Sequence, residues 1–287
     1  MSYAWLVSDT TAPTILITGA TDGLGRALAE RLAGEGATLL LHGRDPEKGE
    51  RVLTEIACAT GNERLRFLRA DLASLEEVRG LGELVRGEAD RLDVLVNNAG
   101  IGTTTPGGSE REESRDGFEL RFAVNYLAGY LLTRLLLDLL RGSSPARIVN
   151  VSSAGQAPID FDDVMLTRNY SGVQAYCQSK LAQVMFTFDL AAELAGSGVT
   201  ANCLHPATYM PTNMVRAAGV TPVSSLDQGA DATIRLVAAP ELADVSGRYF
   251  NGTRVEAPHP QAEDRAARER LRALSDGLCG LDQPGAP

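Results

Sequence analysis

Short apolar runs alternate with longer amphipathic stretches along most of this chain, and this alternation constrains the fold more than any other feature. Six short runs are predicted strands, at residues 14–18, 37–42, 65–68, 94–96, 147–151 and 199–204. The stretches between them have helical spacing, at residues 24–33, 47–59, 75–88, 117–140 and 175–195. Because the runs are not strictly alternating, they suit strands buried on both faces. The pattern predicts a doubly wound α/β domain, with helices on both faces of a parallel sheet.

The remaining segments divide the 287 residues into one domain and two short ends. We expect a flexible tail, a single domain and a helical extension, at residues 1–12, 13–255 and 256–287. The extension contains an arginine-rich helix at 261–278. Within the domain, a polar stretch at 103–116 is expected to be a solvated loop. Two further segments are expected to form flaps over a substrate, at 157–172 and 207–225.

Composition and charge exclude several classes of protein. The chain has 27 Lys and Arg against 37 Asp and Glu, a formal charge of −10, so it lacks the basic face that nucleic acid or anionic lipid requires. The most apolar stretch, 126–140, is interrupted by Arg134 and Asp138, so no membrane insertion is expected. Four dispersed cysteines, three histidines without ligand spacing and the absence of a visible leader predict a cytoplasmic protein with reduced thiols and no metal.

A glycine-rich loop follows the first predicted strand and precedes the first predicted helix. In it, Gly19 permits a tight turn, Gly23 lets a pyrophosphate approach bare backbone, and Gly25 lets the helix pack closely on the strand. The helix N-terminus offers unpaired N–H donors to phosphate. A purely structural turn is the alternative, but the position between strand and helix favours a dinucleotide loop. Its cofactor-binding residues are expected to be Thr18, Gly19, Thr21, Asp22, Gly23, Leu24 and Gly25.

The residues after the second strand bear on the choice of dinucleotide. A carboxylate there would bind the ribose 2′-OH of NAD(H), whereas Arg44 can pair with the 2′-phosphate of NADP(H). Asp45 is one residue away, and Arg44 can also be an ordinary solvated arginine. NADP(H) is therefore favoured, and NAD(H) stays open. Asp71, beyond the third strand, can accept from the adenine amino group or cap the next helix.

The strongest chemical constellation is a pair of serines, Ser152 and Ser153, followed by Tyr176 and Lys180. Tyr176 and Lys180 are four residues apart on a predicted helix and share one face. A phenol has a pKa near 10, and a neighbouring ammonium can lower it by about 1–3 units. A serine hydroxyl can hold a carbonyl oxygen against the phenol. A lone Tyr-x-x-x-Lys pair also occurs by chance on helix surfaces.

The rarity of lysine in this chain makes it less plausible that Tyr176 and Lys180 are paired by chance. Only two basic residues are lysines, Lys48 and Lys180, and the other 25 are arginines. Arginine is therefore the usual surface cation of this chain. Lys180 departs from that usage where a compact ammonium, able to reach ribose hydroxyls, is wanted. We interpret Lys48 as a plain surface residue.

Taken in order, these motifs resemble those of the short-chain dehydrogenase/reductase family over about residues 14–250. The matching residues are the loop at 18–25, Asp71, Asn-Asn-Ala-Gly at 97–100, Asn125, Ser153, Tyr176 and Lys180. Within the family, the chain is most similar to retinol-dehydrogenase-like and related bacterial reductases. The residues that indicate this are Asp-Gly-Phe-Glu at 116–119 and the segments 124–127, 148–153 and 176–183.

The resemblance implies a single Rossmann-type domain and assigns roles to individual residues. Tyr176 would be the general acid/base, and Lys180 would lower its pKa and bind the nicotinamide ribose. Ser153 would orient the substrate oxygen, and Asn125 would hold a water in a proton relay through Lys180. Besides Tyr176 and Lys180, the expected cofactor-binding residues are Arg44, Asp71, Leu72, Asn98, Ala99, Gly100, Pro206 and Thr208.

The chain departs from the family pattern in two places. The segment 157–172 lengthens the connection between Ser153 and Tyr176. Pro206 is followed by an alanine instead of a glycine, so the threonine that would meet the nicotinamide amide is Thr208 or Thr212.

The resulting hypothesis is an NAD(P)-dependent oxidoreductase that interconverts a ketone or aldehyde and an alcohol. Aromatic and methionine residues at 157–170 and 209–214 favour NADPH-dependent reduction of a fairly large apolar small molecule. A non-redox tailoring enzyme (cyclase, dehydratase or epimerase) and a cofactor-sensing regulator are the alternatives. Homo-oligomerisation stays open. Cys177 is expected to pack within its helix, and His205 to be structural.

Overall fold

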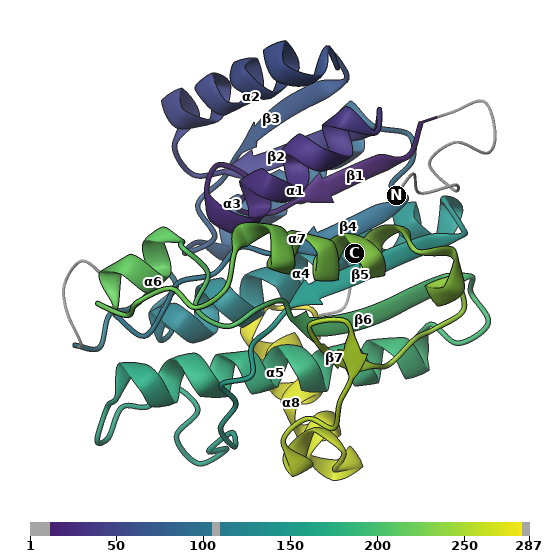
Figure 1. Cartoon of the computed structure of the whole chain (residues 1–287). Coiled ribbons are helices and arrows are strands. Elements are labelled where there is room, and N and C mark those ends of the chain that lie inside the picture. Colours follow the sequence, from purple (N-terminus) through teal and green to yellow (C-terminus); the bar gives the residue numbers. More distant parts are fainter. Residues whose placement is uncertain (1–11, 105–109, 283–287) are drawn as a thin grey trace.

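The apolar runs pair side by side into one eight-stranded sheet, in the order β3-β2-β1-β4-β5-β6-β7-β8 (Figure 1). The computed structural model describes residues 12–104 and 110–282. Strands β1 to β7 are parallel, and β8 returns antiparallel to β7. The strands are β1 (Thr14–Ile17), β2 (Thr38–Gly43), β3 (Leu65–Arg69), β4 (Val94–Asn97), β5 (Ala146–Val151), β6 (Val199–His205), β7 (Tyr249–Asn251) and β8 (Arg254–Val255). The predicted doubly wound parallel sheet is thereby confirmed.

Helices cover both faces of this sheet (Figure 1). One face carries α1 (Gly23–Gly34), α2 (Pro46–Thr60) and α7 (Leu226–Ala238). The other carries α3 (Leu75–Glu88), α4 (Ala128–Gly142) and α5 (Gly172–Glu193). The last helix, α8 (Arg265–Leu278), packs against α5. Short helical turns complete the chain: α6 (Asn213–Ala217), η3 (Pro240–Leu242) and η4 (Pro260–Ala262).

Two hydrophobic cores lie on opposite faces of the sheet. Strand residues alternate between them, since Leu16 packs with α3 and α4 whereas Ile15 and Ile17 pack with α1 and α7. All three side chains have no exposed surface. Strand β1 is therefore buried along its whole length, because both faces of the sheet are covered there.

The helix predicted at 117–140 differs from the structure at its beginning. Gly117 has a φ of +81° and lies in a turn, and a π-helical turn, η2 (Phe122–Leu127), comes before α4. Such widened turns occur often at functional positions, and this one contains Asn125. The helix α7 and the strands β7 and β8 were not predicted, and the extension after residue 255 forms η4 and α8. The expected tail lies almost wholly outside the described residues.

The stretch judged unable to cross a membrane belongs to a longer apolar helix. Phe122–Gly142 is long and apolar enough to span a bilayer, by length and composition alone, and 72% of its most apolar window is buried inside the protein. Its buried leucines face α3 and the sheet. A core helix therefore accounts for the same hydropathy.

Candidate active site and cofactor cleft

The expected site residues gather at the carboxyl ends of the parallel strands. Strand β1 lies between β2 and β4, so the order of the strands reverses at the β1–β4 pair. In open α/β sheets, ligands bind outside the carboxyl ends at such a switch point. The loops that follow β1, β4 and β5 meet there and contain the glycine loop, residues 98–100 and Ser153.

The glycine loop has the shape that a pyrophosphate needs. Gly19 and Gly23 have φ angles of +66° and +49°, which favour glycine. A Cβ on Gly25 would collide with the Gly19 carbonyl and lie 2.6 Å from Asn98 Nδ2. Helix α1 begins at Gly23, so the first-turn amides of Leu24 and Gly25 have no acceptor within the helix. The loop therefore fits an anionic dinucleotide, as expected from the sequence.

Two expected cofactor residues hold this loop from behind. The Thr18 hydroxyl is buried and accepts from the amides of Asn98 and Ala99, at 3.0 Å each. Asn98 Nδ2 donates to the carbonyls of Thr18 (2.8 Å) and Gly19 (3.2 Å). These side chains thereby join the loops after β1 and β4, and their contact with the cofactor stays a prediction.

Asp22 joins three elements around the loop. It caps α1 by accepting from the Gly23 amide at 2.7 Å, and it forms an ion pair with Lys48 Nζ at 2.8 Å. Asn213, the first residue of α6, also donates to its carboxylate. Burial acts to raise the pKa of Asp22, but the bonds from Lys48 and Gly23 outweigh it and lower the pKa. Lys48 is thus not a plain surface residue, because it is bound to the glycine loop.

Asp45 and Asp71, which follow β2 and β3, both bind nearby backbone amides. Asp45 caps α2 and accepts from the Lys48 amide at 3.0 Å, and the adjacent Arg44 is exposed. Asp71 accepts from the Ala73 amide at 3.1 Å. The cap of α3 is Ser74, not Asp71, so the capping alternative for Asp71 is wrong.

Ser153 and Tyr176 meet at the end of β5. The Ser153 side chain lies beside the Tyr176 phenol, near enough to act on its pKa, and Ser153 Oγ accepts from the Gly155 amide at 3.0 Å. The neighbouring serine points elsewhere, because Ser152 Oγ donates to the Lys180 carbonyl at 2.8 Å. This geometry favours the second serine as the reactive one, which agrees with the sequence prediction.

Lys180 is buried behind Tyr176, on the same face of α5. Its Nζ lies 5.8 Å from the centroid of the Tyr176 ring and donates to Val151 O (3.0 Å) and Gln183 Oε1 (2.9 Å). Burial lowers the pKa of Lys180 to about 7. A Cβ on Gly100 would lie 3.5 Å from this Nζ, so the amine lies close to the bare backbone of Gly100 in the loop after β4.

The protonation of Tyr176 differs from the expectation. Burial raises the pKa of the phenol, and the neighbouring Ser153 hydroxyl only partly offsets it. The Lys180 amine is itself buried and directed at Val151 and Gln183. The phenol is therefore neutral and able to donate a proton.

Asn125 is fixed in the π-helical turn. Its Oδ1 accepts from the Ile101 amide at 2.7 Å, and its Nδ2 donates to Ile101 O (3.1 Å) and Ser179 Oγ (3.0 Å). The side chain thus connects the loop after β4 to α5, one residue before Lys180. Its role in a water relay stays a prediction.

The segment 207–225 folds over the cleft. Thr208 is exposed and its hydroxyl lies 3.0 Å from His205 Nε2. Thr212 caps α6, and a Cβ on Gly23 would lie 3.0 Å from its methyl group. Of the two candidate threonines, Thr212 is therefore the one placed against the glycine loop. Tyr209 is half exposed and has a φ of +46°, which is unusual for an aromatic residue and typical of strain at functional sites.

The segment 157–172 is tied to the protein body. Arg121, with no exposed surface, donates to Gly102 O (2.8 Å) and Thr103 O (3.0 Å) and to the Tyr170 hydroxyl (2.5 Å). Phe161 and Met165 pack against the core. The apolar side chains expected to line a substrate pocket here face inward instead, so this segment is a packed wall.

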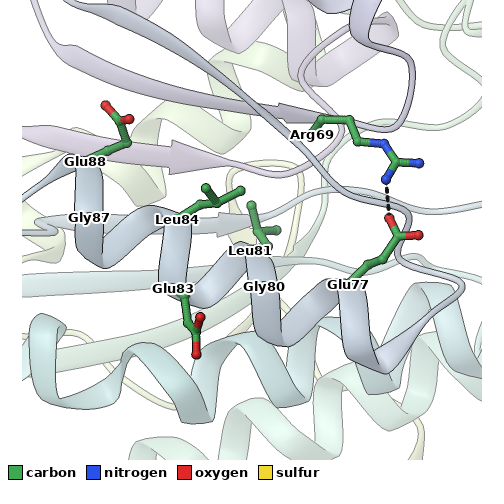
Figure 2. Close-up of a pocket in the computed structure, with 8 residues that line it drawn as sticks. All are labelled: Arg69, Glu77, Gly80, Leu81, Glu83, Leu84, Gly87 and Glu88. Atoms are coloured by element: carbon green, nitrogen blue, oxygen red, sulfur yellow. Dashed lines mark hydrogen bonds and ion pairs between the residues drawn. The ribbon is translucent and has the colours of Figure 1, made fainter.

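A separate hollow of about 560 Å³ lies along α3 (Figure 2). It is bordered by the ion pair between Arg69 and Glu77, at 2.7 Å, and by the half-exposed Leu84. None of the expected catalytic residues lines it, so it is not the substrate site. Among the described residues, no group of three His, Cys, Asp or Glu is placed to hold a metal, and the four cysteines are free.

Comparison with known proteins gives a consistent result. The sequence model of a protein family described as short chain dehydrogenase matches residues 13–221. Human retinol dehydrogenase 13 is 41% identical, over 94% of this chain and 86% of its own length. Human retinol dehydrogenase 14 is 38% identical, over 93% and 86%.

Solved structures agree with these relatives. The 3-ketoacyl-(acyl-carrier-protein) reductase from Brucella melitensis, complexed with NADH, has a TM-score of 0.66 and 25% identity, over 83% of this chain and 96% of that chain. The Pseudomonas aeruginosa RhlG/NADP active-site complex has a TM-score of 0.68 and 25% identity, over 88% and 97%.

Proposed function

The chain belongs to the short chain dehydrogenase family, and from this premise we propose that it is an NADP(H)-dependent oxidoreductase that reduces a fairly large apolar aldehyde or ketone. One observation carries the proposal: the Ser153 side chain lies beside the Tyr176 phenol at the carboxyl end of β5, and the buried Lys180 amine lies 5.8 Å from the centroid of the Tyr176 ring. A proton donor, a second hydroxyl and an amine are thus grouped in one site.

The residues of the site divide the work of proton transfer and orientation. A bound nicotinamide supplies or accepts the hydride. Ser153 and Tyr176 hydrogen-bond the substrate oxygen, and Tyr176 donates its proton as negative charge develops there. Because burial keeps the phenol protonated, Tyr176 is suited to act as the proton donor in reduction. Lys180, held by Val151 and Gln183, would bind ribose hydroxyls and stabilise the phenolate.

Support for NADP(H) comes from the start of α2. Asp45 Oδ1 is used to cap α2, which weakens the case for Asp45 as the acid that binds a ribose 2′-OH. Arg44 is exposed, and Lys48 is held close to the glycine loop by Asp22. The exposed Arg44 supports a 2′-phosphate at this end of the cleft, because a guanidinium can pair with phosphate.

The substrate class follows from the exposed apolar side chains near the site. Tyr209 and Val173 are 50% and 58% exposed, and Tyr209 lies close enough to Tyr176 to contribute to its raised pKa. The relatives named retinol dehydrogenase act, by their name, on an extended apolar alcohol. We further propose a cytoplasmic location, for which the free cysteines give support.

Substitution Tyr176→Phe tests this function. It removes the proton donor and keeps the ring, so NADPH oxidation with retinal should fall by about 10²–10⁴-fold, with NADPH binding retained. Retinal should be reduced with a higher kcat/KM than a short aldehyde such as propanal. Product formed without net NADPH consumption would instead identify a non-redox tailoring enzyme. If the wild type binds NADPH but acts on no carbonyl compound, the regulator hypothesis replaces the oxidoreductase.

A further inference from the structure

A buried histidine lies under the glycine loop, and no step of the proposed reaction uses it. His42 is 2% exposed and occupies the penultimate position of β2. Both of its ring nitrogens are engaged: Nδ1 lies 3.2 Å from the Gly19 amide, and Nε2 lies 3.1 Å from the Ala70 carbonyl. The ring therefore connects the segments that follow β1 and β3, the two neighbours of β2.

These partners fix the protonation of the ring. The Gly19 amide can only donate and the Ala70 carbonyl can only accept, so Nδ1 is the unprotonated nitrogen and Nε2 carries the hydrogen. If Nδ1 were also protonated, its N–H and the N–H of Gly19 would face each other as two donors. Burial agrees with this arrangement, since it lowers the pKa of His42 to about 4. The ring is neutral at physiological pH.

The contacts of His42 also set the direction in which the first amides of the glycine loop point. His42 holds the Gly19 amide with its ring and the Ala20 amide with its own carbonyl, at 2.9 Å. The first two amides of the loop are thus directed into the sheet. The next residue, Thr21, lies over the end of β2, because a Cβ on Gly43 would be 2.7 Å from its methyl group. Moving the ring would therefore move the part of the loop that faces the cofactor.

The contact between His42 Nε2 and the Ala70 carbonyl lies on the side of the cleft where we expect the adenine. Ala70 immediately precedes Asp71 and Leu72, which are expected to lie beside the adenine. An apolar residue at position 42 would leave a buried amide and a buried carbonyl without partners, which is costly.

We propose that His42 is a positioning residue for the dinucleotide: it sets the glycine loop and the segment before Asp71 in the geometry that binds the adenosine and pyrophosphate half. The inference rests on the proposed function, because it assumes that a dinucleotide occupies this cleft. It assigns no catalytic step to His42.

Two substitutions separate the contacts. In His42→Asn, the side-chain oxygen can take the place of Nδ1 and accept from Gly19, whereas in His42→Gln the amide nitrogen can take the place of Nε2 and donate to Ala70. In His42→Ala, both contacts are lost. The measured quantities are the Kd for NADPH by nucleotide fluorescence, the Kd for 2′-phospho-ADP-ribose by competition, the melting temperature, and kcat at saturating NADPH.

We expect His42→Ala to weaken both nucleotides by about tenfold, with kcat at saturation within about twofold of the wild type. His42→Asn and His42→Gln should each recover binding to within about threefold, because each restores one of the two contacts. If all variants that fold bind NADPH like the wild type, including those with a lower melting temperature, the histidine is only structural and the inference is overturned. If the wild type binds neither NADPH nor NADH, the proposed function itself fails. Loss of kcat with unchanged nucleotide affinity would also contradict a positioning role.

Discussion

At the scale of single residues, burial decides the protonation of the groups that would do the chemistry. It raises the pKa of Tyr176 and lowers that of Lys180 to about 7, so both are neutral in slightly alkaline solution. The neutral amine of Lys180 still satisfies its two acceptors, Val151 O and Gln183 Oε1. The sequence predicted which side chains would meet, but the sign of the Tyr176 shift depends on how deeply α5 lies under its neighbours.

The buried amine of Lys180 should make stability depend on pH. Its pKa is about 7 in the folded protein against an ordinary value of 10.5, so between these values the unfolded chain binds more protons and stability rises with pH. Relative to Lys180→Met, the wild type should gain roughly 1.4 kcal/mol per pH unit in that window and nothing below it. Urea unfolding of both proteins from pH 6 to pH 10 measures this. A difference that stays constant with pH would show that the amine keeps its proton.

At the scale of elements, the first turns of α1 and α2 are built from side chains with double roles. Asp22 caps α1 and holds Lys48, while Asp45 caps α2 and leaves Arg44 exposed. Capping occupies Asp45 Oδ1 with a backbone amide, which supports the proposed preference for NADP(H) over NAD(H).

This arrangement predicts the cofactor preference. Arg44→Ala should raise the KM for NADPH about tenfold through loss of a charge-assisted hydrogen bond, and the KM for NADH should stay within about twofold. Arg51→Ala is the matched control, because it removes an exposed arginine further along α2. Steady-state kinetics with both nucleotides gives the ratio. An equal effect of Arg44→Ala on NADPH and NADH would argue against recognition of the 2′-phosphate.

At the scale of the whole molecule, the C-terminal segment is part of the domain and not an appendage. Helix α8 packs on α5 (Figure 1) and buries Leu271 in the core. The hydroxyls of Tyr126 and Ser275 lie 2.7 Å apart, and the Tyr130 hydroxyl donates to Asp276 at 2.6 Å. The predicted arginine-rich helix exists, but the sequence alone did not indicate which surface it covers.

If α8 completes the core, Leu271→Ala should lower the free energy of unfolding by about 2–5 kcal/mol. Leu84→Ala is the control at an exposed leucine, 47% exposed beside the hollow on α3 (Figure 2), and should change stability by less than about 0.5 kcal/mol. Denaturant unfolding compares the two. A loss at Leu271 as small as that at Leu84 would mean that α8 does not contribute to the core.

The sequence by itself determined the parallel sheet, the glycine loop and the order of Ser153, Tyr176 and Lys180, because strand burial, turn geometry and helical spacing are local properties of the chain. It did not determine the partners of side chains distant in sequence. Only the tertiary structure placed Lys48 against Asp22, directed Phe161 and Met165 into the core, and set Thr212 instead of Thr208 beside Gly23. His42 is the clearest case, since its two partners, Gly19 and Ala70, lie in the segments that follow two different strands. The physical reason is that a hydrogen bond or an ion pair depends on distance in space, which sequence spacing fixes only within one helix, strand or turn.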